Sequence, residues 1–321
     1  MERRLTVAVE QLNDAQRERI RAAAAELGLT AEFYPGAQAA LPHVKDSEVI
    51  LGSSPALAAN APRLRWFCAT SAGVEPYLKP GAFLAPDALL TNSSGAYGVT
   101  IAEHTIMVTL ELMRRQQEYT AIVDRRQWKR DLTIRSIRNS RVALLGTGDI
   151  GGEVAKRLRP FEPARIIGVN RSGRNPGGLY DDVIPVDRLD SLLPETDLLI
   201  ISLPGTQETT GLIDDRRLRL LPSDAFLVNV GRGTVIDQSA LEAALRERYL
   251  GGAALDVFEQ EPLDPASTLW TCPRLLITPH CAGNMTLAYT VDRIVDLFLE
   301  DLRAYAKGNP LARSIDRTKG Y

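Results

Sequence analysis

The sequence has few cysteines and little excess charge. Its 321 residues include three cysteines, Cys68, Cys272 and Cys281, and no CxxC pair. This count excludes a disulfide framework and a cysteine-based structural zinc site, and it favours a reducing, cytoplasmic setting. A formal net charge of −2 makes nucleic acid and an acidic membrane surface poor partners. We therefore expect neither partner, and no metal.

The chain also lacks a hydrophobic run that would cross a membrane. Its longest uncharged stretch, residues 275–291, is interrupted by Pro279, Gly283 and Asn284, and its first 19 residues lack the apolar core of a signal peptide. Internal repeats, low-complexity tracts and long linkers are missing too. With 45% hydrophobic residues, the chain is predicted to be a soluble protein of two domains.

Short strand patterns alternate with helical patterns in two series, as is typical of parallel βαβ units. The strands of the first series are predicted at residues 5–10, 31–35, 48–53, 64–71 and 88–92. Those of the second are predicted at residues 141–146, 164–170, 197–204, 225–231, 252–258 and 275–279. Predicted helices include residues 14–27, 153–158 and 238–248, and a long helix opening near Thr100 is expected to join the two series. The pattern predicts an α/β fold with two doubly wound, Rossmann-like parallel sheets.

A glycine-rich turn, GTGDIGG, lies near the middle of the chain. Gly146, Gly148 and Gly151 form a GxGxxG pattern around Asp149 and Ile150, after a predicted strand and before a predicted helix. The first glycine permits a tight turn, the second lets the backbone approach a pyrophosphate, and the third allows close helix packing. A glycine turn without a ligand is the alternative, but the strand–turn–helix context favours a bound dinucleotide.

The loop after the next strand bears on which dinucleotide is bound. NAD sites usually carry an acid about 20 residues beyond the glycines, which accepts from the ribose 2′-hydroxyl. This chain reads VNRSGR there, without an acid. Asn170 and Ser172 are able to hydrogen-bond a 2′-phosphate, and Arg171 and Arg174 to neutralise it. The loop predicts a preference for NADP(H) with NAD(H) possible, the alternative being a solvated basic loop beside an NAD site.

Polar side chains follow three strands of the second series. Arg232 follows residues 225–231, an acidic segment includes Glu259 and Glu261, and His280 follows residues 275–279. Because the carboxyl ends of parallel strands meet at one edge, we expect these groups to converge. Hydride transfer to a carbonyl needs a cation to hold and polarise the substrate and a general acid to protonate oxygen, and histidine suits the acid role.

Seven motifs follow one another in order along nearly the whole chain. They are TSAGVEPY (70–77), GVTIAEHT (98–105), GTGDIGGEVAKRL (146–158), LPGTQETTGLID (203–214), NVGRGTVID (229–237), LDVFEQEPL (255–263) and TPHCAG (278–283). Together they resemble the D-isomer-specific 2-hydroxyacid dehydrogenases, a family that includes glyoxylate/hydroxypyruvate reductases and phosphoglycerate dehydrogenase.

The resemblance implies how the two predicted domains are arranged. A dinucleotide-binding domain of residues 100–287 is expected to be inserted into a flavodoxin-like substrate domain of residues 1–99 plus 288–321. Two hinged crossings would let a cleft between them close on substrate and exclude water. The family also implies a homodimer packed through the cofactor domain.

The resemblance also implies the catalytic roles. Arg232 is expected to bind the substrate, and His280 to act as acid/base. Glu261 is expected to be the carboxylate partner of His280, because the family's acid stands directly before a proline, as Glu261 stands before Pro262. Glu259 is the competing carboxylate.

Further binding residues are implied on both domains. The backbone of Ser71, Ala72 and Gly73 is expected to hold the substrate carboxylate. Tyr97 and Thr100 are weaker candidates for the cleft wall, and packing explains them equally well. The remaining cofactor contacts are expected at Leu203, Pro204, Thr209, Val230, Gly231, Asp256, Ala282 and Gly283, with Asp256 facing the nicotinamide carboxamide.

Other notable residues have structural interpretations. His104 lies in a strong helical pattern and is interpreted as a packed histidine between the domains, not a second catalyst. His43 is expected at the surface, and Cys281 as a small wall residue. Trp128 and the basic residues around it, 125–130, are read as a solvated or dimer-facing segment, because one short cluster is a poor nucleic-acid footprint.

The sequence as a whole predicts an NADP(H)-preferring reductase of small 2-keto acids that forms D-2-hydroxy acids. A dinucleotide-sensing protein, like the corepressors that resemble the same family, is the alternative. The joint presence of Arg232, Glu261 and His280 favours the enzyme.

Overall fold

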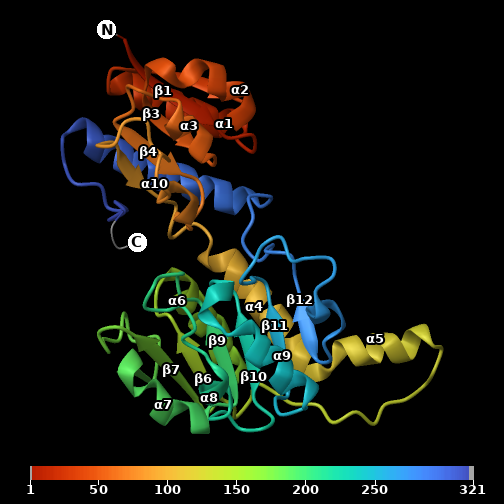
Figure 1. Ribbon diagram of the computed structural model, residues 1–321. Coiled ribbons are helices and arrows are strands. Elements are labelled where there is room, and N and C mark those ends of the chain that lie inside the picture. The colour runs from red at the N-terminus through yellow and green to blue at the C-terminus, as the bar shows by residue number, and fades with distance from the viewer. Residues whose placement is uncertain (1, 318–321) are drawn as a thin grey trace. The chain divides into compact units, whose positions relative to one another are not determined.

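The computed structural model describes residues 2–317, which form two compact units (Figure 1). One unit contains the described residues up to Tyr97 and from Asn284 onward, and the other is Gly98–Gly283. The second unit is therefore an insertion in the sequence of the first. The sequence predicts boundaries at residues 99 and 288, and the substrate and cofactor roles given there to the two units stay predictions.

The first unit contains a five-stranded parallel sheet in the order β2-β1-β3-β4-β5. Its strands are β1 (Arg3–Ala8), β2 (Leu29–Tyr34), β3 (Ser47–Gly52), β4 (Trp66–Ala69) and β5 (Leu89–Thr91). Its helices are α1 (Asp14–Glu26), α2 (Ala37–Ala40), α3 (Pro55–Ala59) and α10 (Ala288–Ala306). This is the flavodoxin-like strand order.

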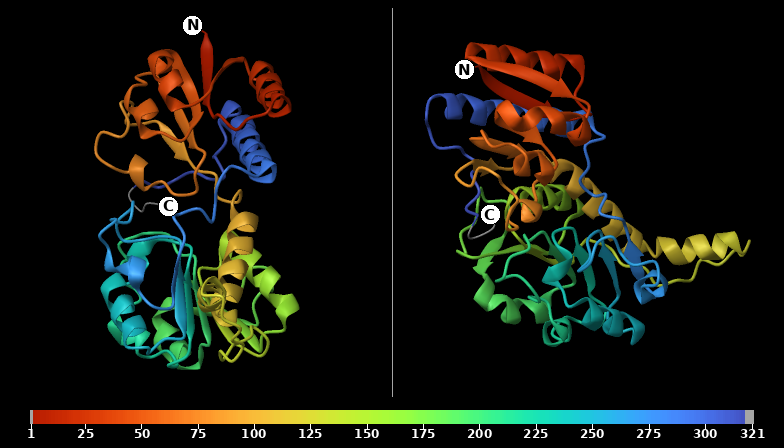
Figure 2. Two further views of the ribbon diagram at one scale, coloured as in Figure 1. Left: turned by 90° about the vertical axis from the view of Figure 1, so that its right-hand side faces the viewer. Right: turned by 45° about the horizontal axis from the view of Figure 1, so that its top comes forward.

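Helices cover both faces of this sheet, because parallel strands are apolar on both sides. One buried cluster joins α1 and α10 to the sheet, with Phe298 stacked on Trp66 at 5.3 Å between ring centroids. Figure 2 shows α10, the C-terminal helix, returning to this unit. A second cluster joins α2 and α3 to the opposite face.

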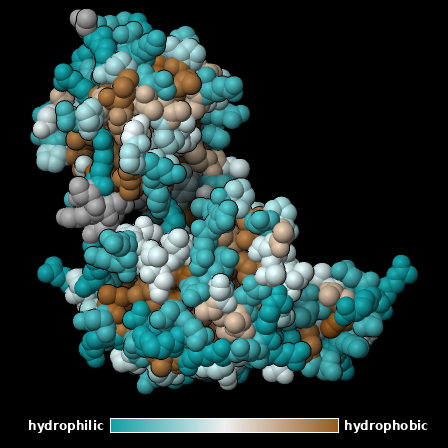
Figure 3. All heavy atoms as spheres, in the orientation of Figure 1, coloured by the Kyte–Doolittle hydropathy of each residue, from teal (hydrophilic) through white to brown (hydrophobic). Residues whose placement is uncertain are grey.

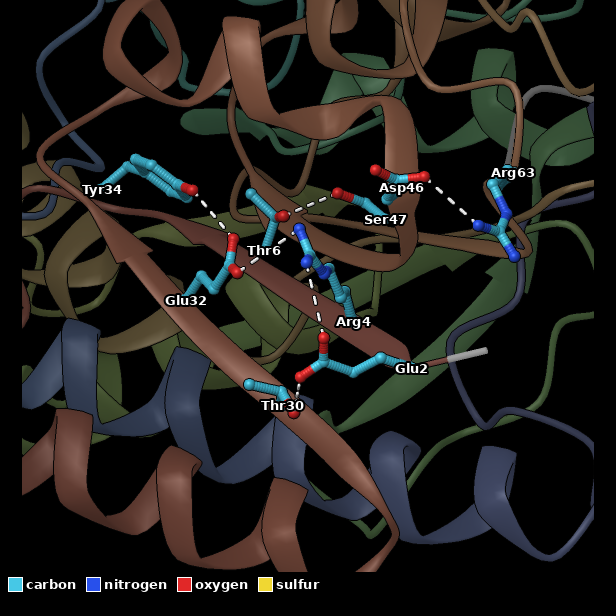
Figure 4. Close-up of polar contacts among 9 residues, drawn as sticks. All are labelled: Glu2, Arg4, Thr6, Thr30, Glu32, Tyr34, Asp46, Ser47 and Arg63. Carbon is cyan, nitrogen blue, oxygen red and sulfur yellow. Dashed lines mark hydrogen bonds and ion pairs between the residues drawn. The ribbon is translucent and has the colours of Figure 1, made fainter.

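Polar pairs tie the strands of the first unit together, as Figure 4 shows. Thr6 of β1 and Ser47 of β3 form a buried hydroxyl pair at 2.6 Å between their Oγ atoms. Arg4 bridges Glu2 at 3.4 Å and Glu32 of β2 at 3.7 Å. These contacts support the pairing of β1 with β2 and β3, and we assign them no catalytic role.

The second unit contains a seven-stranded parallel sheet in the order β12-β11-β10-β9-β6-β7-β8. Its strands are β6 (Arg141–Leu145), β7 (Arg165–Asn170), β8 (Asp182–Pro185), β9 (Leu198–Ile201), β10 (Phe226–Asn229), β11 (Gly252–Leu255) and β12 (Leu275–Ile277). Its helices are α4 (Gly98–Arg114), α5 (Gln116–Asp124), α6 (Asp149–Leu158), α7 (Leu189–Leu192), α8 (Asp215–Leu218) and α9 (Gln238–Arg246). The strand order reverses between β6 and β9, as in a dinucleotide-binding fold, where ligands bind at the reversal.

The structure confirms the predicted α/β class and its two doubly wound parallel sheets. Strand β8 is the one strand of residues 2–317 that the sequence did not indicate. It is a four-residue edge strand that begins with exposed Asp182 and ends at Pro185, so it lacks the apolar run of a buried strand. Helix α6 begins at Asp149, four residues before the predicted start, because the glycine turn itself enters the helix.

Candidate active site

The glycine turn between β6 and α6 has a different constraint at each glycine. Gly146 has φ +102°, and a Cβ there would lie 2.8 Å from Ser202 Oγ. A Cβ on Gly151 would overlap the carbonyl oxygen of Gly146, whereas one on Gly148 would meet no described atom within 4 Å. The first and third glycines therefore serve folding. The second keeps space open at the N-terminus of α6, and this open approach fits a dinucleotide pyrophosphate.

The residues inside this turn face different surroundings. Asp149 is exposed, and its carboxylate lies so close to Gly98 that a Cβ on Gly98 would overlap it. The carboxylate therefore lies at the N-terminus of α4, where a negative charge is stabilised. Ile150 is half-buried. Their predicted cofactor contacts stay predictions.

Asn170 shapes the loop that follows β7, a role that the sequence did not indicate. Its Nδ2 donates to Thr147 Oγ1 at 2.8 Å and to the backbone oxygen of Arg174 at 2.9 Å. Its Oδ1 accepts from the backbone N–H groups of Ser172 at 3.0 Å and Gly173 at 2.7 Å. These bonds show that the side-chain amide shapes the loop, and its predicted contact with a 2′-phosphate stays a prediction. Arg171, Ser172 and Arg174 are exposed on the loop that it shapes.

The loop after β9 is shaped by its threonines. Thr209 Oγ1 donates to the backbone oxygen of Pro204 at 2.7 Å and accepts from the N–H of Thr206 at 2.9 Å. A Cβ on Gly231 would lie 2.8 Å from the backbone nitrogen of Leu203, so the loops after β9 and β10 pack closely. Thr209 thus acts on its own loop, and its predicted contact with the cofactor stays a prediction.

Asn229, which the sequence did not single out, organises the turn that carries Arg232. Its buried side chain donates to the backbone oxygen of Arg232 at 2.9 Å and accepts from the N–H of Gly231 at 3.0 Å. Val230 is buried within the same turn. The guanidinium of Arg232 donates to the backbone oxygen of Gly231 at 2.8 Å. The signal for Asn229 was its place as the first residue of NVGRG.

His280 contacts the carboxylate of Glu261. His280 Nδ1 lies 2.6 Å from Glu261 Oε2, and the histidine side chain is 49% exposed. Glu261 Oε1 accepts from the N–H of Phe258 at 2.9 Å, which fixes the carboxylate. Glu259, the competing acid, instead accepts from the N–H of Gln238 at 2.9 Å. The pair leaves Nε2 of an accessible imidazole as the ring atom that can exchange a proton with a ligand.

A buried carboxylate, Asp256, holds the loop that carries His280. Asp256 is 3% exposed, and its Oδ1 accepts from Thr278 Oγ1 at 2.6 Å and from the N–H of Cys281 at 2.9 Å. Its Oδ2 accepts from the N–H of Ala282 at 3.0 Å. The carboxylate of Asp256 therefore holds this loop in place. Its predicted contact with the nicotinamide carboxamide stays a prediction, and so do the predicted cofactor contacts of Ala282 and Gly283.

His104 belongs to the same group of contacts, so it is more than the packing residue that the sequence suggested. Its Nε2 lies 3.2 Å from Thr278 Oγ1. Burial lowers the pKa of His104, and this effect outweighs the opposite influence of Asp256 and Glu111. The ring therefore stays neutral at neutral pH.

The predicted substrate loop belongs to the first unit, where it follows β4. Ser71 Oγ donates to the backbone oxygen of Gly73 at 2.7 Å, and Asn92 Nδ2 donates to that of Ala72 at 2.7 Å. Tyr97 is buried and donates its hydroxyl to the backbone oxygen of Thr70 at 2.6 Å. Asn92 and Tyr97 thus brace the loop, and the substrate contacts of Ser71, Ala72, Gly73 and Tyr97 stay predictions.

Residues 2–317 show neither a metal centre nor a membrane-spanning helix. No group of three or more His, Cys, Asp or Glu side chains is arranged to hold a metal ion. No helix in the described part of the chain is both long and apolar enough to cross a membrane.

These features define the class of the protein. A Rossmann-order sheet, a GxGxxG turn with open space at its second glycine, and an accessible histidine on a carboxylate are the parts of a dinucleotide-dependent oxidoreductase.

Comparison with known proteins then identifies the family. Residues 106–282 match the model of the NAD-binding domain of D-isomer specific 2-hydroxyacid dehydrogenases. Glyoxylate/hydroxypyruvate reductase A of Salmonella enteritidis is 31% identical over 309 residues, which cover 91% of this chain and 96% of that protein.

Solved structures of similar proteins point to the same family. A family member from Aeromonas salmonicida matches with a TM-score of 0.86 and 32% identity, covering 99% of this chain and 100% of that one. An NADPH-dependent glyoxylate/hydroxypyruvate reductase from Sinorhizobium meliloti, solved with NADP and sulfate, matches with a TM-score of 0.81 and 26% identity over 99% of this chain and 100% of that one.

The chain belongs to the D-isomer specific 2-hydroxyacid dehydrogenase family. It is an NAD(P)-dependent oxidoreductase that acts on the CH–OH group of its donor.

We predict that Cys281 is the thiol that reacts in the native protein. Cys281 is exposed, whereas Cys68 and Cys272 are buried. Partial desolvation of the Cys281 thiol, with the nearby charge of Asp256, raises its pKa above the ordinary value of 9.0. The thiolate fraction therefore keeps rising with pH beyond about pH 9, so Ellman's reagent should label one thiol at a rate that still increases there.

The control for this labelling is Cys281→Ser, which should abolish the reaction of the native protein. A rate that levels off below about pH 8.5 would contradict the raised pKa.

Proposed function

We propose that the protein is an NADP(H)-preferring reductase that converts small 2-keto acids into D-2-hydroxy acids. The observation that carries the proposal is the 2.6 Å contact between His280 Nδ1 and Glu261 Oε2, at the same sheet edge as the glycine turn. The relatives support the substrate class, because the Salmonella protein is named a glyoxylate/hydroxypyruvate reductase. Crystals of similar proteins that contain NADP or NADPH support the cofactor.

Each residue of the proposed site has a task in carbonyl reduction. The positive charge of Arg232 binds the carboxylate of the keto acid and polarises its carbonyl. When bound, the cofactor NADPH would supply the hydride for the carbonyl carbon. His280, protonated on both ring nitrogens, gives its Nε2 proton to the carbonyl oxygen while Glu261 accepts from Nδ1–H and stabilises the charged ring. In the oxidative direction, His280 takes that proton back.

The proposed cofactor site uses three parts of the second unit. The turn at Gly146, Gly148 and Gly151 offers the N-terminus of α6 to the pyrophosphate. Arg171 and Arg174 give the loop after β7 a positive charge suited to a 2′-phosphate, and no carboxylate stands at Asn170, the last residue of β7, to repel it.

The first test is the initial rate of NADPH and NADH oxidation with glyoxylate, hydroxypyruvate, pyruvate, 2-ketobutyrate, 2-ketopantoate and larger 2-keto acids. Turnover with NADPH on any of them supports the proposal. The variant His280→Gln should lower kcat by about 10²- to 10⁴-fold, because it removes the general acid, while NADPH binding measured by fluorescence survives.

Two outcomes would refute this assignment. A His280→Gln variant that keeps wild-type turnover would remove His280 from its role. Tight NADPH binding without turnover on the whole panel would favour a dinucleotide sensor instead.

The cofactor preference depends on the basic loop. Replacing Arg171 and Arg174 together by alanine should weaken NADPH binding by about tenfold or more and change NADH binding much less, since only NADPH carries the 2′-phosphate. Arg165→Ala, which removes an exposed arginine at the other end of β7, is the matched control. Titrations that show equal losses for both cofactors would exclude a 2′-phosphate contact.

We also propose a homodimer in a reducing, cytoplasmic setting. Helix α5 and the segment after it extend from the second unit as an arm, which Figure 1 and the right-hand view of Figure 2 show. Hydrophobic patches lie among hydrophilic ones along this arm in Figure 3, and Val123, Trp128 and Ile134 are 68%, 96% and 43% exposed. Exposed apolar groups of this size gain free energy by burial against a partner.

The role of the arm in dimerisation can be tested by measuring the molecular mass of the protein in solution. Light scattering should give twice the chain mass of 35.2 kDa for the wild type and a value near the monomer for Val123→Glu combined with Trp128→Glu. The matched control is Trp270→Glu, at a tryptophan that is 49% exposed in the segment before β12 and outside the arm's own sequence. A wild-type monomer, or a dimer unaffected by the double variant, would exclude this interface.

A further inference from the structure

A chain of three polar side chains runs from α4 to the loop of His280, all within the second unit. His104 Nε2 lies 3.2 Å from Thr278 Oγ1, which lies 2.6 Å from Asp256 Oδ1. The carboxylate only accepts, so the Thr278 hydroxyl donates its single hydrogen to Asp256. The hydroxyl oxygen must then accept from His104. The contacts therefore define one direction, from His104 Nε2–H through Thr278 to Asp256.

The end of this chain holds three successive residues of the loop. The side-chain carboxylate of Asp256 accepts from the backbone N–H groups of Cys281 and Ala282, at 2.9 and 3.0 Å. The backbone oxygen of Asp256 accepts from the backbone N–H of His280 at 2.9 Å. His280 has φ +50°, in the left-handed region of the backbone that residues other than glycine adopt uncommonly. The contacts of Asp256 hold the backbone in this segment, and the His280 ring lies against Glu261.

We propose that His104 and Thr278 are positioning residues for His280: they orient the carboxylate of Asp256, which fixes the backbone of the acid–base loop. This inference rests on the proposed function, in which His280 is the proton donor. The side chain of His104 is 11% exposed, and the charged groups that act on it are Asp256 and Glu111. A neutral His104 supplies the donor without adding a buried charge.

Two pairs of variants separate positioning from packing. Thr278→Val removes the hydroxyl at nearly constant shape, and Thr278→Ser retains it. His104→Met removes the donor, whereas His104→Gln places an amide N–H near the position of Nε2. We expect Thr278→Val and His104→Met to lower kcat by about tenfold and to change the Kd of NADPH less than about twofold. The serine and glutamine variants should recover most of the loss.

A second measurement needs no turnover. The chain has three histidines, His43, His104 and His280, so protein labelled with ¹⁵N-histidine gives few ring signals, and His280→Gln identifies those of His280. Thr278→Val should shift the His280 ring signals. His43, which stacks on Tyr34 in the first unit at 5.0 Å, is the internal reference and should not change.

The outcomes distinguish this inference from the proposed function. A wild type that reduces no keto acid refutes the proposed function, and the ring signals still test the positioning chain. Unchanged His280 signals in both Thr278→Val and His104→Met would overturn the inference. Equal changes at His43 would overturn it as well, because they would show a general effect on folding. If Thr278→Val does not fold, the comparison of His104→Met with His104→Gln decides between positioning and packing.

Discussion

A buried carboxylate needs hydrogen-bond donors, and the donors available to Asp256 determine the shape of the site. With 3% of its surface exposed, Asp256 draws two backbone N–H groups and one hydroxyl around its oxygens. Leaving such a group unsatisfied would cost several kcal/mol, so the loop from His280 to Ala282 is tied to the end of β11. Orientation of the histidine is thus a consequence of satisfying a buried charge.

At the carboxyl edge of the second unit's sheet, neighbouring loops approach one another closely through their backbones. Gly146, Gly151 and Gly231 lie where a Cβ would collide with neighbouring loops, whereas Gly148 faces open space. The first group lets the loops at the ends of β6, β9 and β10 pack together, and Gly148 leaves the N-terminus of α6 accessible. Glycine therefore serves folding where it allows loops to pack closely, and it serves binding where it leaves space for a ligand. Only the surroundings of each glycine show which of these roles it has.

The fold was largely predictable because apolar runs separated by turn residues are a local property. Buried strands such as β6, β9 and β10 are nearly continuous apolar segments, and the GxGxxG turn has a local mechanism. Strand β8 escaped prediction because an edge strand needs no such run. The loop-shaping contacts of Asn170 with Thr147 and the loop backbone also escaped prediction, because an amide can satisfy a turn as well as bind a ligand.

By itself, the sequence determined the alternation of strands and helices, the glycine turn and the residue types at the ends of the strands, since these depend on neighbours along the chain. It preferred Glu261 to Glu259 as the partner of His280 only through the family resemblance, and it treated His104 as packing. The tertiary structure decided both, because Glu261 lies 2.6 Å from His280 and His104 lies 3.2 Å from Thr278. These contacts join residues 19 and 174 positions apart, and such distances arise only when separate strands and helices pack side by side.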